Sequence, residues 1–469
     1  MVARRPHIKS KLGCTECKRR RIKCGEERPD CSNCRRRNFT CSFHVFDPAP
    51  RSTIPVATGN KVSSRIHVFS QIPDDLHTTQ VGHGLLDANV QAALMEDFPE
   101  SSRSLYLSIL QHFATNTIPT LSYGAAAQVA WQKAIPSLAT SHKFVTNGVL
   151  AVGALHLSEL AATDEEHELY DKIAATQMNY GMAQYRVEVQ NVSTGNAEAL
   201  FAFSATITAF VLFTAGVESA SILKSISGGK LPAKEVVASI TKLVSATCRI
   251  LRGIRGVLVI IVPCWDHIQS GPLGPVVNRD WWPAAVPVTQ EQVEDDQKLR
   301  QLEKMWSRPG RTYEYSFDTL RSTLKYLRES FALVSGLRNL SQSNDPSGDT
   351  PFDWTSVVQW PIALSLEFLT LLEQRRMEAW VLLAHFAILP AKFSGTLWVD
   401  SLAVNLLSTA ALVIGEEEWD WIAWPANTIS IDLDNLRRLP TTPSYSPGQK
   451  LETSSRCPPE SLSVDLSFS

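Results

Sequence analysis

Residues 14–41, CTECKRRRIKCGEERPDCSNCRRRNFTC, contain six of the nine cysteines of this 469-residue chain. The spacing is C-x2-C-x6-C, six further residues, and again C-x2-C-x6-C, so the segment repeats itself with an offset of 17 residues. Paired C-x2-C steps let two thiolates reach one metal ion from a single tight turn, which predicts a metal centre. The six predicted ligands are Cys14, Cys17, Cys24, Cys31, Cys34 and Cys41.

Two other uses of six clustered cysteines fit the chain less well. A disulfide framework needs an oxidising compartment, and the N-terminus MVARRPHIKSKL has no apolar segment of a secretory signal. One tetrahedral zinc would leave two of the six thiolates idle, and two separate zincs would need eight. Six thiolates saturate two zinc ions when two sulfurs bridge both. The sequence therefore predicts a binuclear structural centre with two zinc ions per chain.

The charge of the chain is distributed unevenly between this head and the rest. The formal net charge is -2, but residues 1–44 hold 13 Lys and Arg against 4 Asp and Glu, whereas the remainder holds 32 against 43. A small basic head on a large acidic body is the asymmetry expected when one end meets a polyanion. The charge thus favours nucleic acid as the partner of the cysteine-rich head.

Residues 14–44 resemble the Zn₂Cys₆ binuclear-cluster domain of fungal transcription regulators, with all six cysteines on the ligand positions and Pro29 on the loop proline. The resemblance implies two short helices around the zinc centre, bridging roles for Cys14 and Cys31, and binding of double-stranded DNA at CGG-like triplets in the nucleus. It also implies that Arg20 and Arg21 contact base edges, where this family often has lysine. Phosphate contacts are expected from Lys18, Arg19, Lys23, Arg35, Arg36 and Arg37.

The chemistry of these side chains agrees with that role, since Arg and Lys donate to the guanine O6 and N7 acceptors. A different hypothesis is that the head binds RNA or a protein. Single-stranded RNA would call for aromatic residues that stack on bases, and the head offers only Phe39, Phe43 and Phe46, which are better explained as packing residues.

The composition divides the chain into five parts. Residues 1–13 form a basic disordered arm, 14–44 the cluster domain, 45–98 a flexible Pro- and Ser-containing linker, 99–430 a large all-α regulatory domain, and 431–469 a disordered Ser/Pro-rich tail. No sustained heptad repeat is present before residue 100. A homodimer formed through the helical body and a monomer therefore remain alternatives.

The periodicity of apolar residues predicts a helical body. Two segments of the body allow more than one interpretation. A stripe with steps of three and four residues, from Phe317 to Val334, fits a core helix better than a coiled-coil seam. Residues 199–217 contain no charged residue and are nearly long enough to span a membrane as a helix. No basic cluster or aromatic belt borders the segment, which favours a buried helix over a membrane span. Gly228, Gly229 and Pro232 predict a loop over 219–235.

The body also resembles the regulatory domain of sterol-uptake-control regulators of this class. That resemblance implies an α-helical domain that could take a sterol or another lipid, and cytoplasmic retention until activation. The alternative is a pathway-specific regulator of secondary-metabolite genes without a ligand; no ligand-binding residue is predicted. The resemblance rests on LYLSILQHFATNTIPTLS (105–122), FVTNGVLAVGALHLSEL (144–160), LRGIRGVLVIIVPCWDHIQSGPLGP (251–275), MEAWVLLAHFAILP (377–390) and WDWIAWP (419–425).

No catalytic residue is predicted, and the chain is expected not to be an enzyme. Its glycine-containing segments lack the spacing of phosphate-binding loops or nucleophile elbows. The three cysteines outside the head, Cys248, Cys264 and Cys457, show no nearby charge constellation that would lower a thiol pKa. Four histidines in apolar helical surroundings are expected to be core residues with satisfied hydrogen bonds; they are His112, His156, His267 and His385.

Overall fold

The computed structural model divides the chain into two compact units, Met1–His83 and Gly84–Ser469. The structure describes only part of each unit. In the first unit it describes Cys17, Arg20, Ile22, Cys24 and residues 31–37. In the second it describes Leu85 and residues 87–122, 124–228, 231–278, 286–307, 314–342, 354–393 and 395–437, with the side chains of 340–342 and 437 excepted.

The described part of the small unit is organised around one short helix, α2 (Ser32–Arg35), with Cys31 as its N-cap. Cys17 also has helical geometry, and its carbonyl accepts a hydrogen bond from the Ile22 amide at 3.1 Å. The predicted arm 1–13, most of the linker 45–98, and the tail 431–469 beyond Arg437 lie outside the described residues.

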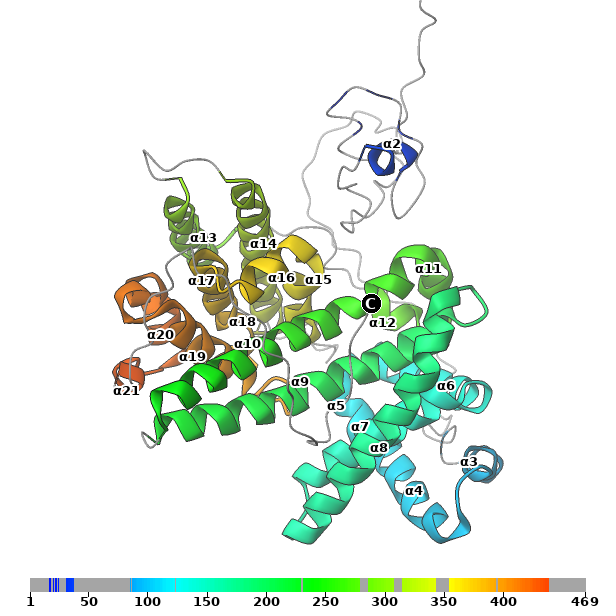
Figure 1. Cartoon of the computed structure of the whole chain (residues 1–469). Helices are drawn as coiled ribbons and strands as arrows, with labels where there is room; N and C mark the ends of the chain where they lie inside the picture. Colours follow the sequence, from blue (N-terminus) through cyan, green and yellow to red (C-terminus); the bar gives the residue numbers. More distant parts are fainter. Residues whose placement is uncertain are drawn as a thin grey trace, which may run out of the picture. The chain divides into compact units, whose positions relative to one another are not determined.

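The described part of the large unit is helical and contains no strand (Figure 1). The fold class predicted for the body is therefore confirmed. Its first half consists of α3 (Ala88–Met95), α4 (Glu100–His112), the π-helical turn η2 (Phe113–Thr117), α5 (Ile118–Leu121), α6 (Ala125–Ser141), α7 (Lys143–Glu159), α8 (Asp164–Glu188), η3 (Val189–Asn191) and α9 (Ala197–Ser227).

The second half continues with shorter helices and several 3-10 turns. These are α10 (Ala233–Gly256), α11 (Leu258–Ser270), α12 (Gly274–Val277), α13 (Gln290–Gln301), η4 (Leu302–Met305), α14 (Ser316–Gln342), η5 (Trp354–Val358), α15 (Gln359–Ala363), α16 (Leu366–Glu373), α17 (Met377–Phe386), α18 (Ile388–Ala391), α19 (Leu402–Ile414), η6 (Glu416–Ile422), α20 (Ala423–Ile429) and α21 (Asp434–Arg437).

Local sequence signals account for where several of these helices begin. Thr163 caps α8 by accepting from the Glu166 amide, and Asp87 caps α3 in the same way. Thr289 and Gln292 form a reciprocal capping box at the start of α13. Such caps satisfy amide groups that have no partner within the helix. Pro263 lies inside α11, where Cys264 leaves helical geometry and kinks the helix.

Helices α9 and α10 lie side by side and connect two groups of helices (Figure 1). α9 packs against α6, α7 and α8 of the first group, and α10 packs against α15, α16 and α19 of the second. The ring of Phe203 on α9 packs directly against Gly148 of α7 and Gly181 of α8. A Cβ atom added at these glycines would lie only 2.7 and 2.6 Å from the ring, respectively. These glycines therefore allow three helices to approach closely.

The apolar segment 199–217 is a helix in the middle of this core. It belongs to α9, which is long and apolar enough to cross a membrane by length and composition, but 78% of its most apolar stretch is buried inside the protein. Its neighbours are α7, α10, α11 and α19. The structure thus supports the prediction of a buried core helix.

The apolar stripe of α14 is also part of the core. Phe317, Leu320, Leu324, Leu327, Phe331 and Val334 are each at most 4% exposed. α14 packs against α13, α15, α16 and α17 of the same chain. The core-helix interpretation is therefore confirmed, and this stripe is not available as a dimer seam.

Three predicted boundaries differ from the structure. The tail predicted over 431–469 includes α21, whose Leu436 is buried in the core. α3 lies within residues 45–98, which the sequence assigned to the linker, and its Leu94 and Met95 are buried in the core. The prolines that signal a linker all precede residue 74, so they say nothing about this helix. The loop predicted over 219–235 is short, because α9 continues to Ser227 and α10 starts at Ala233.

Candidate zinc centre and nucleic-acid interface

Three of the six predicted ligands come together in the small unit. The sulfur atoms of Cys17, Cys24 and Cys31 all lie within 4.8 Å of one another, and all three residues are buried. The Cys17 and Cys31 sulfurs are 3.6 Å apart. Two thiolates on one tetrahedral zinc, at Zn–S distances of about 2.3 Å, stand about 3.8 Å apart, whereas a disulfide is about 2.05 Å long. The sulfur separation therefore fits metal ligands.

Cys31 and Cys34 lie one helical turn apart on α2. The Cys34 amide donates to the Cys31 sulfur at 3.4 Å, and Cys34 is buried as well. Burial tends to raise the pKa of the Cys31 thiol. Hydrogen bonds from the Cys34 amide and from the thiols of Cys34, Cys17 and Cys24 outweigh it and lower the pKa to about 6. The site therefore favours the thiolate, which is the form that binds zinc.

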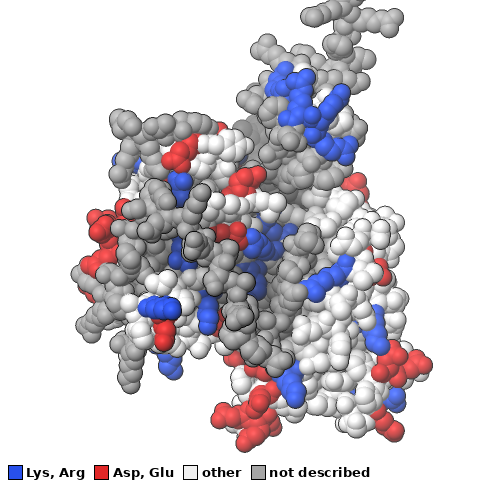
Figure 2. Space-filling model, in the orientation of Figure 1, with Lys and Arg blue, Asp and Glu red and all other residues white. Residues whose placement is uncertain are grey.

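The basic residues of the small unit are on its surface. Arg35, Arg36 and Arg37 are exposed at the C-terminal end of α2, and Arg20 is half-buried. Arg36 donates to the Asn33 side chain at 3.3 Å. Figure 2 shows these blue side chains together on the small unit. The remaining predicted site residues lie outside the described residues; they are Cys14, Cys41, Lys18, Arg19, Arg21 and Lys23.

Comparison with protein families shows which known domain the small unit matches. Residues 12–50 match the fungal Zn(2)-Cys(6) binuclear cluster domain. The chain carries a Zn₂Cys₆ DNA-binding domain. Residues 108–221, from α4 to α9, match the fungal specific transcription factor domain. Together the two matches make the chain similar to fungal-type Zn₂Cys₆ transcription regulators, and they support DNA binding and a nuclear location.

Three curated relatives have similar names. A Zn(2)-C6 fungal-type transcription factor of Gibberella zeae is 21% identical over 92% of this chain and 88% of its own length. The transcription factor afumD of Aspergillus fumigatus is 29% identical over 41% of this chain. An uncharacterized transcriptional regulatory protein of Schizosaccharomyces pombe is 24% identical over 41%. The chain spans 44% and 30% of the last two relatives' lengths. No solved structure matches this chain significantly.

A Zn₂Cys₆ domain holds two zinc ions, and the described cysteines suit them. Their buried sulfurs are close together, no disulfide joins them, and the Cys31 thiol ionises readily. Zinc saturated by thiolates has no open position for substrate, so its contribution is to hold the fold of the small unit. The geometry thus agrees with a structural centre that presents basic side chains.

The two described cysteines of the large unit are unlike those of the cluster. Burial, together with the negative charge of nearby Glu373, raises the pKa of the Cys248 thiol to about 12. Burial also raises the pKa of the Cys264 thiol. Thiols with raised pKa values are poor nucleophiles and poor metal ligands. Their surroundings agree with the expectation that these cysteines are structural.

Two of the four singled-out histidines form a polar cluster between the two groups of helices. His112 and Thr117 each approach the His156 Nδ1 atom, at 3.2 and 3.0 Å. The hydroxyl of Thr120 donates to the Thr117 carbonyl. Trp354 and Trp398, from the second half of the chain, donate to the carbonyl and the hydroxyl of Thr120. The π-helical turn η2 thus carries a hydrogen-bond network that joins the two halves.

The other two histidines differ from each other. His385 is 3% exposed and its Nδ1 atom lies 2.8 Å from the Val381 carbonyl, whereas His267 is half-buried. The prediction of hydrogen-bonded core histidines is confirmed for His156 and His385, whereas His112 is hydrogen-bonded but half-buried. For His267 it stays a prediction.

We expect the large unit to lose stability in acid because these histidines are buried in the neutral form. Burial lowers the pKa of His156 to about 4, with a further contribution from His112, and burial lowers the pKa of His385 to about 4. Between pH 6.5 and 4 the unfolded chain therefore binds more protons than the folded chain. Stability should be complete above pH 6.5 and should decrease as the pH falls toward 4, which thermal unfolding at pH 7.5 and about 5 would measure.

The variant His385→Gln provides the control, since its amide can still donate to the Val381 carbonyl but does not titrate. It should show a smaller loss of melting temperature between the two pH values than the natural chain. An equal loss in both proteins would exclude His385 as a cause.

Proposed function

We propose that this regulator recognises a CGG-like DNA element in the nucleus through basic side chains displayed by its zinc cluster. The observation that supports the proposal is that the Cys17, Cys24 and Cys31 sulfurs lie buried at zinc-ligand separations, while arginines are exposed at the C-terminal end of α2, the short helix that Cys31 caps. A basic surface held in register by metal is the electrostatic arrangement typical of DNA-binding modules.

The proposed residue roles follow the chemistry of each side chain. Cys14, Cys17, Cys24, Cys31, Cys34 and Cys41 hold two zinc ions, with Cys14 and Cys31 bridging. Arg20 and Arg21 donate to guanine edges in the major groove, each contact adding about 1–3 kcal/mol of discrimination. Phosphate contacts come from Lys18, Arg19, Lys23, Arg35, Arg36 and Arg37, which add affinity without sequence information.

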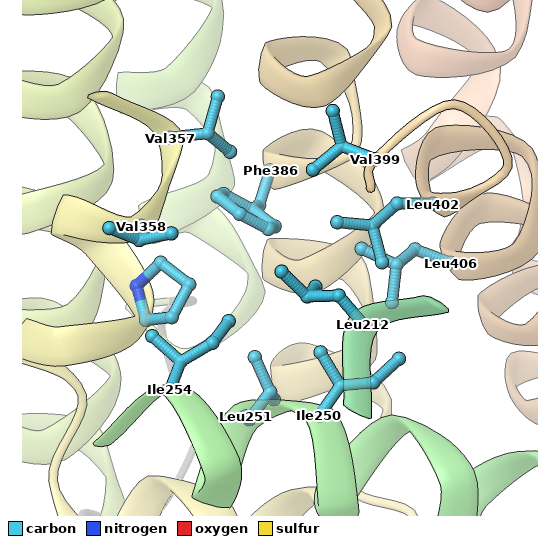
Figure 3. Close-up of a pocket in the computed structure, with 11 residues that line it drawn as sticks. Leu212, Ile250, Leu251, Ile254, Val357, Val358, Phe386, Val399, Leu402 and Leu406 are labelled. Carbon is cyan, nitrogen blue, oxygen red and sulfur yellow. The ribbon is translucent and has the colours of Figure 1, made fainter. Parts of the chain in front are cut away.

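We propose that the helical body regulates this DNA-binding activity. Eleven apolar residues from α9, α10, η5, α15, α17 and α19 and from the segment before α19 line a pocket, in which their side chains converge (Figure 3). The cavity among them measures about 10 Å³, which is room for about one water molecule. Ligand sites usually measure about 300–1,000 Å³. This pocket is therefore too small to hold a sterol.

The experiment that tests the proposed DNA readout compares two arginines of the small unit. Arg20→Ala should weaken binding to a CGG-containing site by about 1–3 kcal/mol and relax its preference over other GC-rich sites. Arg35→Ala should weaken binding to all sequences alike and lower the salt dependence by about one phosphate contact. Fluorescence anisotropy on specific and scrambled duplexes at several salt concentrations measures both effects.

The matched control is Lys133→Ala, which removes an exposed basic residue from α6 of the body and should leave DNA binding unchanged. Equal losses for Arg20→Ala and Arg35→Ala on scrambled DNA would remove the base-reading role of Arg20. Tighter binding to single-stranded RNA than to duplex DNA would overturn the proposal in favour of the RNA-binding hypothesis.

A further inference from the structure

Helix α8 leaves one face uncovered along its whole length. Its opposite face is buried against α7 and α9 and includes Ile173, Met178 and Tyr185. On the uncovered face, Leu169 is 45%, Tyr180 61% and Val187 69% exposed. Thr176 on the same face is half-buried. At 3.6 residues per turn, Leu169, Thr176, Tyr180 and Val187 fall within an arc of about 40°. We call these four residues the α8 stripe.

The α8 stripe differs from the other exposed apolar residues of the large unit's helices. Val217, Val237, Val259, Leu366 and Val404 lie on five different helices. Single exposed apolar residues are ordinary on protein surfaces and need no explanation. Three large exposed apolar side chains in line on one helix form an apolar face of the kind that marks contact with another macromolecule.

The spacing of the stripe indicates what covers it. Its residues are separated by seven, four and seven positions, so the stripe reads the same from either end. A two-fold axis near Met178 would place Leu169 opposite Val187 of a second copy and Tyr180 opposite Thr176 of that copy. A patch that is complementary to itself under a two-fold axis is what an isologous dimer interface requires.

The charge along α8 favours the same arrangement. Residues 164–172 contain Asp164, Glu165, Glu166, Glu168 and Asp171 against Lys172, whereas residues 173–188 contain only Arg186 and Glu188. Parallel helices would place two strongly acidic halves together, and like charges repel. Antiparallel helices place each acidic half beside the nearly neutral half of the other copy, which removes this repulsion.

We propose that two copies of this chain associate through antiparallel packing of their α8 stripes. The interface does not depend on the zinc cluster, and it brings together two DNA-binding units in a chain that has no heptad repeat before residue 100. One helix pair buries less than the standard interface of about 1,600 Å², so a dissociation constant in the micromolar range is expected. DNA with two half-sites would strengthen the dimer by raising the effective concentration.

Sedimentation of the full-length chain across the micromolar range tests the interface. The natural chain should change from monomer to dimer as its concentration rises. Tyr180→Glu with Val187→Glu should raise the dissociation constant by about 100-fold, because it buries unpaired charge. Leu366→Glu, which alters an equally exposed apolar residue on α16 (68% exposed), should dimerise like the natural chain.

A cysteine pair tests the direction of the helices. Leu169→Cys with Val187→Cys should cross-link two chains under mild oxidation, whereas Leu169→Cys alone should not. A monomeric natural chain throughout this range, free and on DNA with two half-sites, would overturn the proposal. So would a dimer that is unaffected by Tyr180→Glu with Val187→Glu. Both double variants keep the small unit intact, so binding to a single half-site reports separately on DNA recognition.

Discussion

Replacing Cys31 by alanine is expected to abolish sequence-specific DNA binding while the helical body stays folded. The Cys31 sulfur lies at the centre of the described cysteines, 3.6 Å from the Cys17 sulfur and 3.4 Å from the Cys34 amide. Structural zinc contributes about 10–16 kcal/mol of folding free energy in small domains, so a lost ligand should unfold the small unit. Specific affinity should fall about a thousandfold, to the nonspecific level. Gel-shift titration measures the loss.

The body provides the controls for this variant. Because Met1–His83 and Gly84–Ser469 are separate compact units, the far-ultraviolet circular dichroism of Cys31→Ala should keep its helical signal. Cys248→Ala removes a buried thiol of α10 and should keep full DNA affinity. Chelation of the natural chain should reproduce the loss seen with Cys31→Ala. Specific binding by Cys31→Ala with two zinc ions still bound would exclude Cys31 as a ligand.

Phe203→Ala is expected to destabilise the large unit by about 3–5 kcal/mol, the range for a large aromatic residue removed from a core. Phe203 is 0% exposed and packs edge-on against Phe144, with ring centroids 5.5 Å apart. The Tyr185 ring also packs against it, with ring centroids 5.1 Å apart. The variant would leave a cavity where α7, α8 and α9 meet. Denaturant unfolding followed by tryptophan fluorescence measures the change.

A second substitution separates tight packing from a general loss of contacts. Gly181→Ala adds a Cβ that would lie 2.6 Å from the Phe203 ring, so it should also destabilise the unit. Combined with Phe203→Leu it should cost less than the sum of the two single changes, since the smaller side chain makes room. Strict additivity would show that the two residues are not coupled. The exposed Val404→Ala should have little effect.

Much of the fold could be predicted because the relevant signals are local. The cysteine spacing predicted a metal centre, and steps of three and four from Phe317 to Val334 predicted a buried helix, which is α14. Absence of basic or aromatic flanks around 199–217 favoured a core helix, which is α9. The cysteine spacing follows from the geometry of metal ligation, and the two helix patterns follow from the requirement that residues facing the core be apolar.

The features that could not be predicted depend on distant parts of the chain. Leu94 and Met95 are buried by helices that follow them, so nothing near residue 90 marks α3 as part of the core. The many acidic residues at the start of α8 make its apolar stripe hard to recognise in the sequence. Which residues of α8 are exposed depends on where α7 and α9 pack. Only coordinates can show that the cavity at Phe386 is too small for a sterol. The proposed DNA-reading roles of Arg20 and Arg21 rest on the family resemblance.

Selection of the preferred site from random duplex DNA by the zinc-loaded full-length chain tests the central claim most directly. We predict enrichment of a GC-rich element that contains a CGG-like triplet, and loss of that enrichment when zinc is chelated. A pool that shows no sequence preference over the starting DNA, with two zinc ions bound per chain, would contradict the proposed function.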